Sequence, residues 1–129
     1  MDQDEKNNII ATFKASLDSI FDEKLKQEKW KEKVNNFNAK VNFAVLVGDG
    51  NKEKIYLSLV SENGEVNLSP GMIDDADFEL AATFDVFFNI ATGEANAILA
   101  LLMGKLKVKN LLKNFKKVLF LQKFLVLEK

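Results

Sequence analysis

The chain has 129 residues, of which 47% are hydrophobic and 29% are charged, so we expect a soluble protein with one domain and one core. It contains no cysteine and no histidine, and all 18 of its basic residues are lysines. These absences exclude disulfides, thiolate metal sites and the commonest general base. They also argue against sequence-specific nucleic-acid binding, which relies on arginine.

The formal charge of −1 is unevenly distributed along the chain. Residues 49–94 carry a net charge of −8, whereas residues 95–129 carry +7. A lysine-rich segment of this kind is either a solvated surface or a surface that makes transient contact with an anionic membrane, where each lysine contributes about 1 kcal/mol. The polar, acidic N-terminus does not resemble a secretory signal, so a cytoplasmic protein is expected.

Two helices are predicted at the start of the chain. Residues 5–22 place apolar side chains at spacings of three and four, which is typical of an amphipathic helix. Residues 23–37 are heavily charged, with Trp30 and Val34 as apolar anchors, and they indicate a second helix that ends near Asn35.

Five later stretches alternate between apolar and polar residues, as strands do when one face of a sheet is covered and the other is wet. Asp49-Gly50 and Asn63-Gly64 indicate hairpin turns between the first three. We expect helices to cover the apolar face. The predicted strands are residues 39–47, 55–60, 65–69, 77–82 and 105–109.

Three further helices are predicted. The first begins at Phe84 and is closed by Gly93 in the left-handed conformation. The second, residues 95–103, is apolar nearly all round, so it should be buried on several sides or face a ligand. The third covers residues 110–129. Its predicted apolar stripe comprises Leu111, Leu112, Phe115, Val118 and Leu119, and the apolar residues that do not fit this stripe are Phe120, Leu121, Phe124 and Leu127.

No conventional active site is visible in the sequence. The acidic residues Asp74, Asp75, Asp77 and Glu79 do not have the spacing of a calcium-binding loop, and a solvated loop explains them better. No serine lies in a Gly-x-Ser-x-Gly turn, and the isolated glycines form no phosphate-binding loop. An active site would have to be built from Tyr56, lysines and carboxylates alone. We therefore expect a protein that is not an enzyme, with neither metal nor cofactor.

The surplus of apolar residues near the C-terminus has two interpretations. It fits a large filled core, with a dimer interface, and it also fits a pocket for a lipid. The composition alone favours the filled core.

The segment from Ala76 to Asn110 resembles the lipid-binding domain of the sterol carrier protein type 2 family. The shared features are the Thr92-Gly93 helix end, Asn96, Ala100 and the run Gly104-Lys105-Leu106-Lys107 that opens the last strand. Asn110 stands where the family usually has glycine, and asparagine also tolerates the left-handed conformation.

This resemblance implies an α+β fold in which a five-stranded, mostly antiparallel sheet, covered on one face by helices, encloses an apolar tunnel. It implies a carrier of a sterol, fatty acid, fatty acyl thioester or phospholipid. The alternative is a non-catalytic dimerisation or docking module with an apolar C-terminal interface. We expect a monomer or weak homodimer.

In the lipid-carrier interpretation, Gly104 lets the chain turn sharply between the apolar helix and the last strand. Lys105, Lys107 and Lys109 then point to solvent. The C-terminal helix is a lid, so truncation after Asn114 is predicted to leave a folded sheet but weaken lipid uptake. The predicted ligand-binding residues are Phe84, Phe87, Phe88, Ile98, Leu101, Leu102, Met103, Phe120, Leu121 and Phe124.

Overall fold

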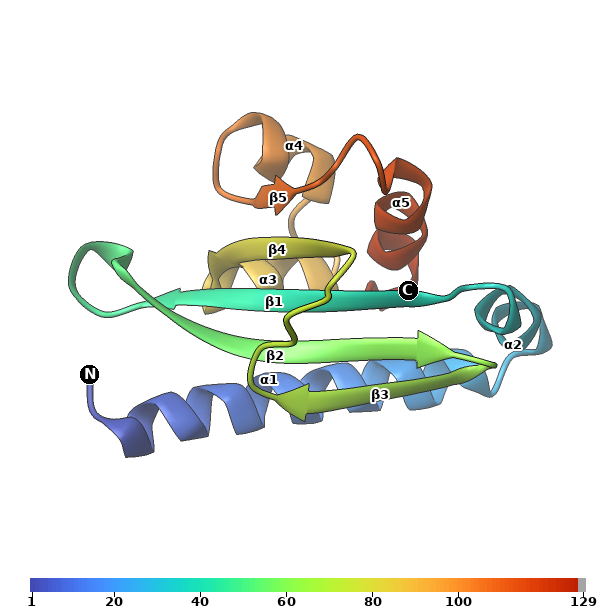
Figure 1. Cartoon of the computed structure of the whole chain (residues 1–129), viewed down its shortest axis with the longest axis horizontal. Helices are drawn as coiled ribbons and strands as arrows, with labels where there is room; N and C mark the ends of the chain where they lie inside the picture. Colours follow the sequence, from blue (N-terminus) through green and yellow to red (C-terminus); the bar gives the residue numbers. More distant parts are fainter. Residues whose placement is uncertain (128–129) are drawn as a thin grey trace.

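A computed structural model describes residues 1–127 of the chain (Figure 1). A five-stranded sheet lies in front of a long N-terminal helix, and the C-terminal elements gather along one edge of the sheet. The elements in order are α1 (Gln3–Leu25), α2 (Glu28–Asn35), β1 (Ala39–Val47), the 3-10 turn η1 (Asp49–Asn51), β2 (Glu53–Glu62), β3 (Glu65–Pro70), β4 (Phe78–Thr83), α3 (Phe84–Ala91), α4 (Ala97–Leu102), β5 (Lys107–Lys109) and α5 (Phe115–Phe124).

The sheet has the strand order β3-β2-β1-β4-β5. β1 and β2, β2 and β3, and β4 and β5 pair antiparallel, whereas β1 and β4 pair parallel. The predicted α+β class and the mostly antiparallel five-stranded sheet are therefore confirmed. α1 and α3 lie behind the sheet, on the face where the side chains of Val41, Phe43 and Val45 are fully buried (Figure 1).

The parallel pair requires a crossover, which residues 71–77 make across the outer face of the sheet (Figure 1). The Asn42 side chain accepts a hydrogen bond from the Ile73 amide at 3.0 Å and donates one to the Ile73 carbonyl at 2.8 Å. Asn42 and Ala44 are consequently buried on the face that alternation predicts to be wet. The crossover explains this difference, because it replaces solvent with polypeptide over the middle of β1.

The N-terminal helices match the prediction closely. α1 begins after Asp2, whose carboxylate accepts a hydrogen bond from the Glu5 amide at 2.8 Å and so caps the helix. Its apolar stripe packs on the sheet, and the ring of Phe13 meets that of Phe43 edge-on at 5.6 Å between centroids. The buried hydrophobic residues of α1 are Ile10, Phe13, Leu17, Ile20 and Phe21.

The predicted C-terminal helix over residues 110–129 is wrong in extent. Residues 110–114 form turns, and α5 begins only at Phe115. Asn110 has a φ of 62°, as expected of a residue that replaces glycine. Asn114 donates hydrogen bonds to the carbonyl oxygens of Asp77 and Asn110, at 2.8 and 3.0 Å, which holds the turn against the sheet. Residues 128–129 lie outside the part that the structure describes.

For the helix predicted at residues 95–103, the first of the two alternatives, burial on several sides, is wrong. The helix is shorter, covering Ala97–Leu102, and within it only Ala100 is buried. Leu99 and Leu102 expose more than half of their surface. An all-round apolar sequence predicts burial only if other elements surround the helix, and α4 lies at the edge of the molecule (Figure 1).

Candidate functional site

An apolar pocket of about 180 Å³ lies at the sheet edge formed by β4 and β5, between this edge and α3, α4 and α5. Among residues 1–127, no charged side chain lines it, and Gln122 supplies the only polar side chain in the lining. The lining residues are Leu80, Phe87, Ile90, Ala97, Ile98, Leu101, Leu106, Val108, Leu111, Phe115, Val118, Leu119, Gln122 and Leu125.

β4, β5 and α3 build the floor of the pocket. Leu80 of β4 and Val108 of β5 are register partners, so their side chains lie on the same face of the sheet. The chain turns from β4 directly into α3 because the Thr83 hydroxyl accepts a hydrogen bond from the Val86 amide at 3.3 Å. This tight connection brings Phe87 to the pocket.

The wall formed by α4 depends on the glycine that follows it. Gly104 has a φ of 78°, and its amide donates to the Leu101 carbonyl at 3.2 Å. The next amide, that of Lys105, donates to the Ala100 carbonyl at 2.9 Å. These two bonds form a Schellman motif, which ends the helix and turns the chain toward β5. The predicted role of Gly104 as the turning point is therefore confirmed.

Side chains along β5 alternate between the two faces of the sheet, and this alternation keeps the lysines away from the pocket. Val108 faces the pocket, while Lys109 lies on the opposite face of the sheet with its register partner Glu79. The Glu79 carboxylate oxygen Oε2 lies 3.6 Å from Nζ of Lys109 and 3.8 Å from Nζ of Lys54. Lys105 and Lys107 are exposed, so all three lysines have the predicted orientation away from the apolar interior.

α5 carries two apolar faces, and the face that lines the pocket is not the one that was predicted to bind the ligand. The predicted stripe faces the pocket through Phe115, Val118 and Leu119, whereas Leu112 precedes the helix and is 93% exposed. Three of the four residues that did not fit the stripe form a second face toward α1 and α2, whereas Leu127 lies beyond the helix and is exposed. This face consists of Phe120, Leu121 and Phe124.

The predicted lid residues belong to the protein core. Phe124 is fully buried and stacks on Phe21 of α1 with ring centroids 4.7 Å apart. Phe120 lies 4.3 Å from Phe37 and 6.0 Å from Trp30, again between ring centroids. Leu121 is buried as well. None of the three lines the pocket, and all three pack in the interior of the protein.

Of the other predicted binding residues, Phe87, Ile98 and Leu101 line the pocket. Phe84 and Phe88 stack on each other at 6.1 Å instead. Leu102 and Met103 are exposed at the end of α4. These four do not line the pocket because they point to other sides of their short helices.

The lining residues that the site prediction missed carry two recognisable signals. Leu106 and Val108 alternate with lysines on the last predicted strand. Val118 belongs to the predicted stripe, and Gln122 and Leu125 follow it at helical spacings of four and three. Extending the stripe toward the C-terminus by these spacings would have reached both residues.

Charged groups elsewhere form pairs at the surface. Nζ of Lys40 donates to the Asp75 carboxylate at 2.6 Å. This hydrogen bond, together with the attraction between the two opposite charges, lowers the pKa of Asp75 and raises the pKa of Lys40. Within residues 1–127, no group of three or more Asp or Glu side chains is arranged to hold a metal ion.

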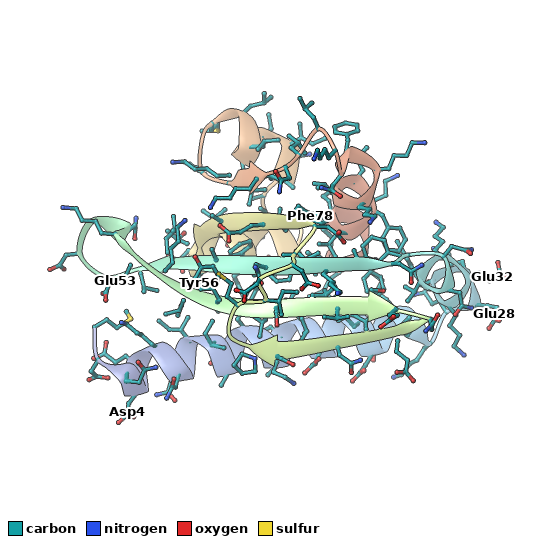
Figure 2. The ribbon with its side chains drawn as sticks, viewed as in Figure 1. Asp4, Glu28, Glu32, Glu53, Tyr56 and Phe78 are labelled. Atoms are coloured by element: carbon teal, nitrogen blue, oxygen red, sulfur yellow. The ribbon has the colours of Figure 1, made fainter. Side chains whose placement is uncertain are left out.

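The remaining candidates for chemistry are dispersed. Figure 2 shows Glu53 at the β1–β2 hairpin and Glu28 and Glu32 at the opposite end of the molecule on α2. Tyr56, the only tyrosine, lies on β2 and does not line the apolar pocket. None of the helices in the described part of the chain is long and apolar enough to span a membrane.

Several solved structures share this fold. The sterol carrier protein 2 of Yarrowia lipolytica in its apo form superposes with a TM-score of 0.67 and 23% identity, over 88% of this chain and 86% of that chain. The UbiJ-SCP2 ubiquinone synthesis protein gives 0.65 and 15%, over 97% and 93%. The sec-alkylsulfatase Pisa1 from Pseudomonas sp. gives 0.62 and 19%, over 77% of this chain but 14% of that chain. At these low sequence identities, the similarity shows a shared fold and nothing more.

Among curated protein sequences, no significant match to the chain was found. A profile of the SCP-2 sterol transfer family, in contrast, matches residues 17–119, which include all five strands of the sheet and all of α3 and α4. This match confirms the resemblance seen between Ala76 and Asn110, and the fold and the apolar pocket agree with it. The chain therefore belongs to the SCP-2 sterol transfer family.

Proposed function

We propose that the protein binds a lipid in the pocket between α3, α4, α5 and the β4–β5 edge, and transfers it without chemical change. The observation that carries this proposal is the pocket lining, in which Gln122 is the only polar residue among those that the structure describes. Apolar walls favour hydrocarbon because binding removes apolar surface from water. Membership of a sterol transfer family supports the same class of ligand.

The pocket must widen to take a whole lipid. Its volume of about 180 Å³ is close to that of a cavity of about 150 Å³ that holds benzene, and below the range of roughly 300 to 1,000 Å³ for ligand sites. α4 is the element best able to move, since Ala100 is its only buried residue. We infer that α4 moves outward when the hydrocarbon enters.

The pocket should accept several kinds of lipid. Burial of a methylene group contributes about 0.8 kcal/mol, so a sixteen-carbon chain offers on the order of 10 kcal/mol before ordering costs. This is sufficient without a specific polar contact. Fatty acids, fatty acyl thioesters, phospholipids and sterols are all candidate ligands. The side-chain amide of Gln122 is available to form a hydrogen bond with the polar group of the lipid. We infer a non-catalytic carrier with a cytoplasmic location.

A matched pair of substitutions tests the pocket. Ala97→Phe places a ring in the pocket, whereas Ala95→Phe adds the same ring at an exposed position two residues away that does not line it. Titration with a fluorescent sixteen-carbon fatty acid should give at least tenfold weaker binding for Ala97→Phe and unchanged binding for Ala95→Phe. Equal binding by both variants and the unmodified protein would show that the lipid does not occupy this pocket.

A docking or dimerisation module is the alternative function. The observation that favours it is the exposed apolar surface on α4 and in the turn before α5. In the alkylsulfatase, a domain of this fold forms a small part of a larger chain. Sizing chromatography combined with the titration separates the two functions, because a dimer that binds no fatty acid indicates docking and a monomer that binds it indicates transport.

A further inference from the structure

An exposed apolar surface surrounds the pocket on its α4 side. We call it the α4 patch, and it extends from α4 into the turn before α5. Scattered apolar residues are normal on a protein surface, but a contiguous group marks an interaction site. The α4 patch consists of Ile98, Leu99, Leu102, Met103, Leu112 and Phe115, which expose between 51 and 93% of their surface.

Lysines accompany the α4 patch at each end. Lys105 follows Met103 closely, and Lys113 and Lys116 directly follow Leu112 and Phe115. All three lysines are exposed, and within residues 1–127 none of them forms an ion pair. The sequence from residue 95 to residue 127 contains seven lysines and no acidic residue. Lys109 and Lys117 pair with Glu79 and Asp77. Lys105, Lys113 and Lys116 therefore combine with the exposed apolar side chains to give a surface whose positive charge no ion pair among residues 1–127 neutralises.

The α4 patch is continuous with the pocket. Ile98 and Phe115 both line the pocket and remain about half exposed, so they form its mouth. They approach from α4 and α5, which lie along the same edge of the molecule (Figure 1). A partner that covers the patch would also cover this mouth.

We propose that the α4 patch docks on an anionic membrane, with the apolar side chains in the acyl region and the lysines among the headgroups. Each lysine near such a surface contributes about 1 kcal/mol, and a short apolar helix lying in the interface adds the burial of its side chains. The pocket mouth then opens directly toward the lipid. Docking on the membrane does not depend on the proposed function. The use of docking for lipid uptake rests on the proposed function, because it requires that the pocket binds a lipid.

A second copy of this chain is a less suitable partner. Two α4 patches facing each other would also bring two sets of lysines together, and like charges across an interface oppose association. An anionic membrane supplies the opposite charge. The charge of the surface therefore favours a membrane over self-association.

The docking is tested with the full chain and sedimented vesicles. Vesicles of 70% phosphatidylcholine and 30% phosphatidylglycerol should bind the protein, and raising the salt concentration or using pure phosphatidylcholine should weaken binding at least tenfold. Leu99→Ser combined with Leu112→Ser should weaken it about tenfold or more, because two exposed leucines no longer enter the membrane. Met72→Ser is the matched control, since Met72 is exposed on the crossover and lies outside the patch.

A fluorescent label shows which surface enters the membrane. The chain has no cysteine, so Leu102→Cys and Met72→Cys each provide a single labelling site for a polarity-sensitive dye. The dye at position 102 should shift to shorter wavelength on the anionic vesicles, and the dye at position 72 should not. Equal shifts at both positions, or equal vesicle binding by the double serine variant and the unmodified protein, would overturn the proposal.

The test distinguishes docking from ligand binding. Leu99 and Leu112 do not line the pocket, so the double serine variant should still bind the fluorescent fatty acid in solution. Ala97→Phe should lose fatty acid binding and keep vesicle binding. A concentration-dependent dimer that the double serine variant abolishes, with no binding to vesicles, would instead assign the α4 patch to a second copy.

Discussion

Single residues with unusual backbone conformations set the shape of the pocket edge. Gly93, Gly104 and Asn110 all have positive φ. The sequence analysis placed Gly93 at a helix end and Gly104 at a sharp turn, and it gave Asn110 as a residue that tolerates the left-handed conformation. Such positions can be predicted because few residues tolerate this region of backbone space. The burial of Asn42 could not be predicted in this way, because it depends on a crossover between distant strands.

Gly104 offers a test of backbone strain without steric conflict. A Cβ atom at this position would meet nothing within 4 Å, so only the φ of 78° disfavours a side chain. Gly104→Ala should lower the free energy of unfolding by about 1–2 kcal/mol, and Gly104→Asn should lower it less. Urea denaturation measures both. Equal losses for Ala and Asn would show that left-handed strain is not the cause.

The Lys40–Asp75 pair predicts a pH dependence of stability. The pKa of Asp75 in the folded protein is lowered from its ordinary value of 3.8 by the Lys40 hydrogen bond. The pair therefore stabilises the fold above about pH 4, and this contribution is lost as the pH falls through the lowered pKa. Asp75→Asn should be less stable than the unmodified protein at pH 7, and the difference should shrink toward pH 3.

The control for this pair is the adjacent residue Asp74, which forms no ion pair within the described chain. Urea denaturation of Asp74→Asn should show no comparable difference from the unmodified protein at pH 7. High salt should reduce the effect of Asp75→Asn, because the pair is exposed and ions screen it. A difference between Asp75→Asn and the unmodified protein that grows as the pH falls would contradict this account.

At the scale of elements, helices with one apolar stripe were easier to predict than helices with two. α1 has a single stripe, and its buried face matches the periodicity. α5 faces the pocket on one side and the aromatic core on the other, so its periodicity cannot say which face is buried deeper. Truncation after Asn114 is therefore expected to unfold the protein rather than open a lid, because it removes Leu121 and Phe124 from the core.

The two faces of α5 can be compared with one type of substitution. Phe124→Ala should lower the free energy of unfolding by about 3–5 kcal/mol, because it removes a fully buried ring that stacks on Phe21. Phe115→Ala, at a half-exposed position on the pocket side, should cost about 1 kcal/mol or less. Urea denaturation gives both values. A larger loss for Phe115→Ala would mean that the pocket face, not the aromatic face, holds α5 in place.

At the scale of the whole molecule, element order and hydrophobic periodicity predicted the α+β class and the number of strands. Alternation placed Val41, Phe43 and Val45 on the buried face, as the structure has them. The pocket could not be located to the same degree, since its lining depends on how five successive elements, from β4 to α5, pack against one another. The exposure of α4 is likewise a property of the assembled molecule, because its sequence alone favours burial.

The central claim is that the pocket beside α4 holds a lipid, and native mass spectrometry tests it most directly. The purified protein, incubated with a sixteen-carbon fatty acid, should appear with the added mass of one ligand. Ala97→Phe, treated in the same way, should appear mainly at its bare mass. A bare mass for the unmodified protein, or equal ligand occupancy in both proteins, would contradict the account.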